Sequence, residues 1–350
     1  MFRGRIAWLA VLLAAACLLA ATGRATAEKK GKAGGKLFEE IRLTKNPVID
    51  TDPVFSPDMK EIVFISVSNK EGRFSLHVMN ADGSKRRVLL DVKGESHAKP
   101  LFFPDGERIL FVFNRGDSSN FAVVKRDGKG RKDLTSLAGR VSSPAISPDG
   151  KRFAFILSTD RQYLYMYDME EGKARKLVET ENDCDSPVFS ADGKQVFYCE
   201  FNENGTNICK VNVDGSRRRV LTSTGPGEGM DNVSPTVVKD GRVFYQSDVK
   251  AGYFQVWSMR PDGGDKKLVC DKEIFSFAVT PDGNYLVYLA ALDFRNWEYF
   301  FYDIAAGKAK RITDNIYREK RPAISPDGKW LLYVSEVEGN PEIFKMRIAK

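Results

Sequence analysis

The residue types that most often carry out catalysis or bind metals are few and scattered in this chain. Only two of its 350 residues are histidine, His77 and His97, whereas zinc and copper sites need several nitrogen or sulfur ligands. No Gly-x-Ser-x-Gly nucleophile motif occurs. The glycine-rich stretch 225–229 lacks the Lys-Ser or Lys-Thr pair of a phosphate-binding loop. The sequence therefore predicts no catalytic residue, no metal site and no cofactor, although enzymatic activity stays an open alternative.

Cysteines offer one further chemistry, the disulfide. Cys199 and Cys209 flank a predicted hairpin turn around 204–205, and residues on facing strands can be bridged only at suitable ladder positions. We favour buried free thiols over this disulfide. The two other cysteines beyond the N-terminal leader are Cys184 and Cys270.

The chemistry that does recur is that of a tight turn. Variants of Ser-Pro-Asp-Gly occur seven times, with their aspartates 42 to 48 residues apart. Proline presets φ, aspartate bonds to nearby backbone and glycine accepts a positive φ, so each copy predicts a turn between two strands. In the first copy Met59 replaces the glycine, which predicts a strained turn or another turn type. The aspartates are Asp58, Asp105, Asp149, Asp192, Asp240, Asp282 and Asp327.

Each repeat contains four apolar runs separated by turn signals, which predicts a four-stranded antiparallel sheet. The middle runs, such as Phe153 to Leu157, are apolar on both faces and must be covered on both faces. Radial stacking of such sheets satisfies this need. We therefore predict an all-β fold, a seven-bladed β-propeller of four-stranded antiparallel blades.

The last repeat has only three runs, and the missing one stands near the other end of the chain. Residues 40–44 resemble the fourth run of the other repeats, and Thr44 precedes a first-strand proline by nine residues, as Thr135 and Thr313 do. We expect this N-terminal strand to complete the last blade and close the ring, so that the propeller spans residues 37–350.

The first 27 residues have the features of a signal peptide. Two arginines precede the apolar run 6–22, and Ala25-Thr26-Ala27 matches a signal peptidase site. Lipidation at Cys17 or an uncleaved leader is the alternative. Residues 28–36 are predicted to form a basic, flexible tail, and no other segment is long enough to span a membrane. The sequence predicts a periplasmic or secreted protein that contacts a membrane only through an uncleaved or lipidated leader.

The formal net charge of +7 does not indicate a nucleic-acid binder. The leader and the tail each contribute a net charge of +3, so residues 37–350 are nearly neutral. Basic residues also recur in the fourth runs, for example Arg86-Arg87 and Lys310-Arg311. Charge on an outer strand prevents edge-to-edge pairing, which is the interpretation that we favour over an anionic surface ligand.

The recurring Pro-x-Phe-Ser-Pro-Asp-Gly-Lys, followed by an aliphatic strand and an Asn-x-Asp-Gly turn, resembles the repeat of the TolB-like β-propeller family. The resemblance covers residues 37–350. It implies an exported, usually periplasmic, interaction protein. TolB itself is expected to differ by an additional N-terminal α/β domain and a six-bladed propeller, so we expect a stand-alone relative. Propellers of the prolyl oligopeptidase kind are similar in their repeats but carry a hydrolase domain.

The candidate binding residues belong to two groups. Residues directly before the first-strand prolines are expected to rim the central channel. In the sixth blade, Arg295 and Trp297 are predicted to anchor a partner or a glycan, with blade packing as the alternative. The rim residues are Asp52, Lys99, Ser143, Ser186, Ser234, Ser276 and Arg321, of which Ser276 precedes Phe277 in place of proline.

We expect a non-catalytic module that binds a protein or peptide on its loop face, the end opposite the Pro-Asp-Gly turns. The alternative is a carbohydrate-binding or carbohydrate-active propeller, in which Asp183 and Asp231 could act as an acid–base pair if about 5–10 Å apart. His77 is expected in a third strand and His97 in a loop between blades, where it could reach the central face. The ligand and the oligomeric state stay open.

Overall fold

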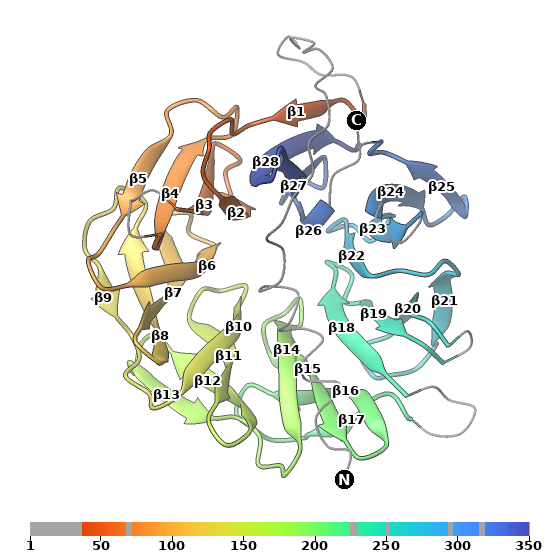
Figure 1. Ribbon diagram of the computed structural model, residues 1–350. Coiled ribbons are helices and arrows are strands. Elements are labelled where there is room, and N and C mark those ends of the chain that lie inside the picture. Colours follow the sequence, from red (N-terminus) through yellow and green to blue (C-terminus); the bar gives the residue numbers. More distant parts are fainter. Residues whose placement is uncertain are drawn as a thin grey trace. The chain divides into compact units, whose positions relative to one another are not determined.

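The computed structural model describes residues 37–67, 72–224, 230–249, 252–292, 297–314 and 319–349. These residues form seven four-stranded antiparallel sheets that surround a common axis (Figure 1). The predicted fold class is confirmed. The predicted signal peptide and basic tail, residues 1–36, lie outside the described residues.

In the first six blades the strands follow one another from the axis outward (Figure 1). The innermost strands are β2 (Asp50–Phe55), β6 (Ser96–Phe102), β10 (Arg140–Ile146), β14 (Asp183–Phe189), β18 (Asn232–Val237), β22 (Ser276–Val279) and β26 (Glu319–Ile324). The second strands are β3 (Glu61–Val67), β7 (Arg108–Arg115), β11 (Arg152–Ser158), β15 (Gln195–Asn202), β19 (Val243–Ser247), β23 (Tyr285–Ala291) and β27 (Trp330–Val337). The third strands are β4 (Phe74–Asn80), β8 (Ser118–Lys125), β12 (Gln162–Asp168), β16 (Gly205–Asn212), β20 (Gln255–Met259), β24 (Trp297–Asp303) and β28 (Asn340–Arg347). The outermost strands are β5 (Arg87–Leu90), β9 (Lys132–Asp133), β13 (Lys173–Lys176), β17 (Arg219–Val220), β21 (Lys267–Cys270), β25 (Lys308–Arg311) and β1 (Glu40–Arg42).

The middle strands are buried on both faces, as their composition predicts. In β11, Phe153 and Phe155 pack into the cluster shared with the preceding blade, whereas Ala154 and Ile156 pack into the cluster shared with the following blade. Alternate side chains of one strand therefore join two neighbouring blades.

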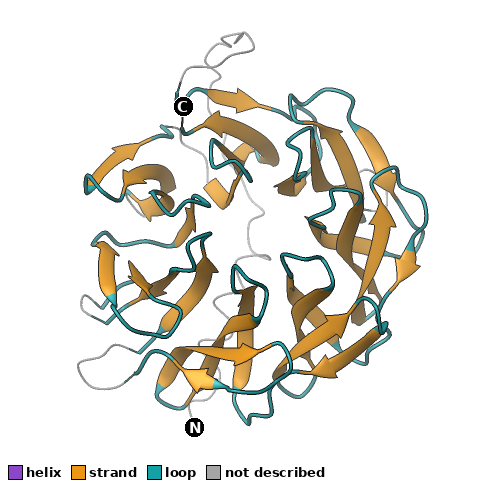
Figure 2. Ribbon diagram, turned by 180° about the vertical axis from the view of Figure 1, so that it is seen from behind, coloured by secondary structure: helices purple, strands orange, loops and turns teal. Residues whose placement is uncertain are grey.

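The described residues include no helix that is long and apolar enough to cross a membrane, and Figure 2 shows strands joined by loops.

The recurring turn is held by its serine or threonine. In five turns this hydroxyl donates to the aspartate two residues later at 2.5–2.6 Å and accepts a backbone N–H from five residues later at 2.9–3.0 Å. Met59 donates its N–H to Ser56 as the glycines of the other turns do, with a φ of 62°. The first turn is therefore of the same type and strained. The Ala81 N–H donates to the Lys60 carbonyl at 2.9 Å, so both kinds of turn lie at the same end of the blade.

The N-terminal strand closes the ring. β1 pairs antiparallel with β28, and the Arg42 guanidinium donates twice to the Glu342 carboxylate, both at 2.7 Å. The Thr44 hydroxyl accepts the Ile343 N–H at 2.9 Å. Thr135 and Thr313 accept equivalent bonds from the third strands of their own blades at 2.9 and 2.8 Å. The repeat phase inferred from these threonines is thus confirmed.

Arginines at the outer strands have a second role that the edge-charge interpretation missed. In five blades an arginine in or next to the outermost strand turns inward and pairs with a buried carboxylate. A buried carboxylate is tolerated only when it is paired and hydrogen-bonded. The pairs are Arg42–Glu342, Arg86–Asp50, Arg131–Glu95, Arg218–Glu200 and Arg311–Glu298.

Cys199 and Cys209 cannot form a disulfide in this fold. Cys199 pairs with Ile208 and Cys209 pairs with Tyr198, a register difference of one residue. Because facing residues share a side of the sheet, the two thiols point to opposite faces. Both are buried and free, as are the thiols of Cys184 and Cys270.

The expectation that His97 lies in a loop and reaches the central face is wrong. His97 lies on the innermost strand β6 and is 2% exposed, with Nε2 at 3.3 Å from Glu95. His77 lies on the third strand β4 as expected and is also buried, with Nε2 at 3.0 Å from the Ser75 hydroxyl. Blade packing therefore covers both rings.

Replacing Arg42 with methionine tests the closure. Glu342 is 1% exposed, so the variant leaves a buried carboxylate without its cation, which costs about 3 kcal/mol. We expect a melting temperature several degrees lower than that of the unmodified chain. The double variant R42M/E342Q removes the buried charge and should regain part of the lost stability. A double variant less stable than R42M would contradict this role of the Arg42–Glu342 ion pair.

The buried His77 makes a second prediction, about pH. Burial lowers the pKa of His77 to about 4, with a further contribution from Arg86. Below the unfolded pKa of about 6.5 the unfolded chain takes up a proton that the native ring does not, so stability falls between pH 6.5 and 4. At pH 5 this amounts to about 2 kcal/mol. His77→Phe should reduce the fall in melting temperature between pH 7 and 5, and an unchanged fall would exclude His77 as its source.

Candidate functional site

The innermost strands share an unusual backbone at the predicted rim. Asp52, Lys99, Ser143, Ser186 and Ser234 all have φ between 49° and 57°, in the left-handed region that non-glycine residues rarely adopt. In each case the strand's pairing register shifts at this position, which marks a β-bulge. The bulge and its proline therefore recur together around the axis.

Of the last two rim residues, Ser276 differs from these five, whereas Arg321 lies at the same kind of register shift. Ser276 lies in a regularly paired strand, β22, where phenylalanine stands in place of the proline. The register of β26 shifts between Lys320 and Ala323, which includes Arg321. The side chain of Arg321 is outside the described part of the structure.

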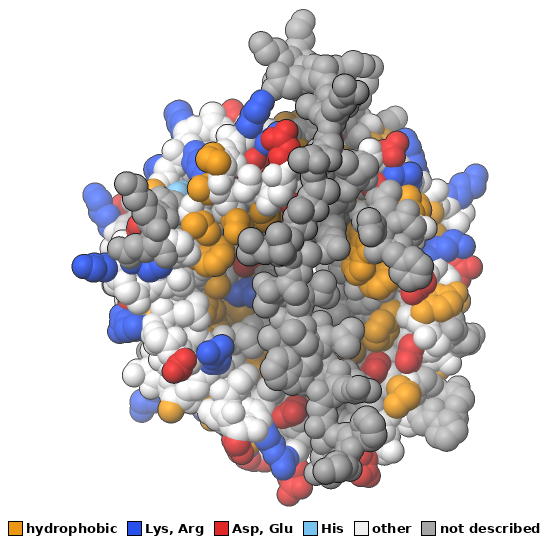
Figure 3. All heavy atoms as spheres, viewed as in Figure 1, with side chains coloured by type: hydrophobic (Ala, Val, Ile, Leu, Met, Phe, Trp, Pro, Cys, Tyr) orange, Lys and Arg blue, Asp and Glu red, His pale blue; other side chains and the backbone are white. Residues whose placement is uncertain are grey.

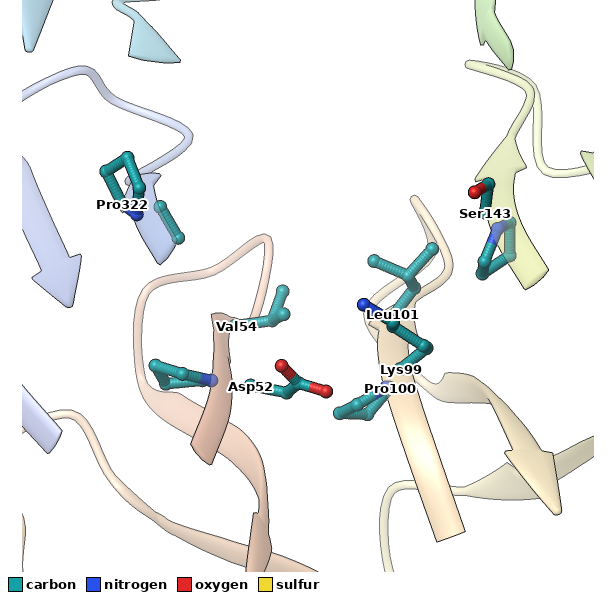
Figure 4. A pocket seen from close by; sticks show the side chains of 10 residues that line it. Asp52, Val54, Lys99, Pro100, Leu101, Ser143 and Pro322 are labelled. Atoms are coloured by element: carbon teal, nitrogen blue, oxygen red, sulfur yellow. The ribbon is translucent and has the colours of Figure 1, made fainter. Parts of the chain in front are cut away.

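Three of the rim residues line one pocket. The pocket has a volume of about 250 Å³ and lies between β2, β6, β10 and β26 (Figure 4). The Asp52 carboxylate points from β2 toward β6, which carries Lys99. The lining residues are Asp52, Pro53, Val54, Lys99, Pro100, Leu101, Ser143, Pro144, Pro322 and Ala323. One carboxylate, one ammonium and one hydroxyl thus stand in a wall that is otherwise proline and aliphatic; we call it the axial pocket.

Asp185 connects the third and fourth blades beside this pocket. Its carboxylate accepts the Ser143 hydroxyl at 2.8 Å and the Ser186 N–H at 2.6 Å. The bond from Ser143 orients a pocket residue across a blade boundary. The sequence analysis did not identify Asp185 as a binding residue or the prolines as pocket walls, although the recurrence of the first-strand proline in six of the seven repeats was the available signal.

The structure does not bring the sixth-blade aromatic group to the axis. Trp297 begins β24, the third strand of its blade, and its ring lies 4.2 Å from that of Phe275 between centroids. Arg295 lies outside the described residues. Trp297 also packs against the core cluster shared by the sixth and last blades, so it belongs to the blade packing at least in part.

The two carboxylates of the predicted acid–base pair, Asp183 and Asp231, each accept a hydrogen bond within the fold. Asp183 accepts the Gln162 N–H at 2.9 Å, and Asp231 accepts the Thr206 hydroxyl at 2.6 Å. Each carboxylate therefore accepts a hydrogen bond from the third strand of the preceding blade, β12 or β16. In the described portion of the chain, no three side chains of histidine, cysteine, aspartate or glutamate come together in a metal-binding arrangement.

The chain is similar in sequence and in fold to several known proteins. The chain is 24% identical over 314 residues to dipeptidyl-peptidase 5 of Porphyromonas gingivalis, a match covering 86% of this chain and 39% of that protein. An oligogalacturonate lyase solved with manganese superposes with a TM-score of 0.75 at 16% identity, covering 89% of this chain and 93% of the lyase. TolB from Acinetobacter baumannii superposes with a TM-score of 0.53 at 18% identity, covering 81% and 78%. At these identities the structural matches show a shared fold alone.

The chain matches 21% to 39% of the length of three curated relatives, all of them peptidases by name. The TolB beta propeller domain matches residues 67–296, about two thirds of the chain. The same residues contain most of the bulged strands and recurring turns described above. The chain therefore belongs to the TolB beta propeller domain family.

Proposed function

We propose that this chain is an exported, non-catalytic propeller that binds a peptide segment of a partner protein in the cell envelope. The observation that carries the proposal is the axial pocket, where Asp52, Lys99 and Ser143 stand among four prolines. Export rests on the signal-peptide prediction for residues 1–27, and the periplasm on the family resemblance.

The size of the axial pocket favours a peptide side chain as its occupant. At about 250 Å³ it is smaller than the roughly 300–1,000 Å³ of sites that enclose a drug-sized molecule. One or two side chains of an extended segment would fill the pocket, whereas an oligosaccharide is too large to be enclosed by it. The proline walls have little freedom to lose on binding, which favours affinity.

The strained β-bulges support the proposal that the rim residues bind a ligand. A left-handed non-glycine residue costs of order 1–3 kcal/mol and persists where the surrounding structure enforces it. Here the strain recurs at five equivalent positions on the innermost strands. It is the backbone geometry that presents the side chains of Asp52, Lys99 and Ser143 to a ligand.

The carbohydrate alternative has less support. The likeness to an oligogalacturonate lyase shows a shared fold and nothing more. Both histidines of this chain are buried in blade packing, so neither ring is exposed to a ligand. Asp183 and Asp231 each accept a hydrogen bond from a strand of the preceding blade. The axial pocket carries both an acidic residue, Asp52, and a basic residue, Lys99. A peptide segment has charged groups that can pair with them, whereas a neutral sugar has none.

Site-specific photo-crosslinking in intact envelopes tests the proposal. A benzophenone side chain at position 143 should capture one protein, and Lys99→Glu should reduce the product at least about tenfold, equivalent to about 1.4 kcal/mol. The matched control places the same group at Asn284, an exposed turn residue of the sixth blade that does not line the axial pocket.

Lys194→Glu, an exposed change in another turn, should leave the crosslink from position 143 intact. Identical products from positions 143 and 284, or a product insensitive to Lys99→Glu in a chain of unchanged melting temperature, would reject the axial pocket as the binding site.

A further inference from the structure

Exposed hydrophobic side chains gather on one part of the loop face. Met230 precedes β18, Tyr253 lies between β19 and β20, and Phe275 precedes β22. Leu292 and Trp297 flank the connection from β23 to β24. Met230, Tyr253, Phe275 and Leu292 are 39–59% exposed, although each is a large apolar residue. We call these five residues the loop ledge.

Two hydrogen bonds and a ring contact link the loops that carry the loop ledge. The Met230 N–H donates to Asp248, at the start of the loop that carries Tyr253, at 2.9 Å. At the other end of that loop, the Phe254 carbonyl accepts the Ile274 N–H at 2.9 Å. Phe275 follows and its ring contacts Trp297. Figure 3 shows hydrophobic and acidic side chains side by side over β18 to β24.

The described charges around the loop ledge are mainly negative. Glu203, Asp231, Asp248, Asp271 and Glu273 stand in the loops that form or border it. Lys272 is the cation among these described loop residues, and it already pairs with Asp271 at 3.1 Å. An apolar surface bordered by acids attracts a partner whose hydrophobic side chains are flanked by cations.

We propose that the loop ledge binds a protein segment in which hydrophobic side chains alternate with lysine or arginine. This inference rests on the proposed function as a partner-binding propeller and assigns a second surface, apart from the axial pocket. Phe275 and Tyr253 supply the aromatic contacts. Glu273 and Asp271 supply the charge that selects a basic segment and speeds its association.

Three labelled peptides of equal length, titrated against the chain that starts at Glu28, test the loop ledge by fluorescence anisotropy. They are a lysine–leucine peptide, a glutamate–leucine peptide and a lysine–serine peptide. The lysine–leucine peptide should bind at least about tenfold more tightly than either of the others. Its affinity should fall as NaCl rises from roughly 0.05 to 0.5 M, because salt screens the charges around the loop ledge.

Variants locate the binding. Tyr253→Ser with Phe275→Ser should weaken the lysine–leucine peptide at least about tenfold, as loss of aromatic anchors does. Glu273→Lys should weaken it and flatten its salt dependence. The matched control, Val88→Ser with Leu268→Ser, removes two equally exposed apolar side chains from the outermost strands β5 and β21 and should change nothing.

Four results would overturn the proposal. They are equal binding of the three peptides, and equal loss in the ledge and control variants. A concentration-dependent dimer abolished by Phe275→Ser would show that a second copy covers the ledge. Binding that appears only after removal of residues 28–36 would show that the basic tail covers it.

Failure of this inference is distinct from failure of the proposed function. If only the ledge inference is wrong, the crosslink from position 143 and its sensitivity to Lys99→Glu remain. If the proposed function is wrong, that crosslink is absent whatever the loop ledge binds.

Discussion

Each sheet of this protein is apolar on both faces, and neither face can be covered from within its own blade. β11 illustrates the constraint, because its alternate side chains belong to two different clusters. A stack of such sheets leaves two open apolar faces unless the first blade meets the last. Pairing of β1 with β28 removes them by joining the two ends of the propeller. Blade number, loop positions and the axial pocket all depend on that closure.

Ion pairs between an arginine and a buried carboxylate repeat in five of the seven blades, including the blade that closes the ring. Carboxylates buried near the inner three strands are neutralised by arginines that reach in from the outer edge. Around Glu95, burial raises the pKa but hydrogen bonds from Arg131 and Arg115 outweigh it and lower the pKa to about 2. A buried ion pair adds little net stability against an apolar pair of the same shape. What it provides here is a fixed position for the outermost strands, all of which have only two to four residues.

The rigid ring separates two kinds of surface. At the axis, prolines and strained bulges hold a small pocket of mixed polarity. On the loop face of the fifth and sixth blades, loops of different length expose large apolar residues beside acids. The structural end, with its hydroxyl-to-aspartate turns, is nearly the same from blade to blade. Variation is thus confined to regions that closure does not constrain, where loops can change without opening the ring.

Periodicity by itself determined the blades, their number, the turn chemistry and the strand that closes the ring, because these follow from local turn geometry and from alternation of apolar residues. Tertiary structure alone decided what depends on neighbours. A register difference of one residue puts Cys199 and Cys209 on opposite faces, and His97 is buried on a strand that its sequence position did not reveal. Asp52, Lys99 and Ser143 share a pocket with prolines from four blades, while Trp297 begins the third strand of its blade and packs against Phe275. Spacing along the chain sets which residues occupy equivalent positions, but contact between blades depends on the ring's curvature and on side-chain direction, which spacing does not encode.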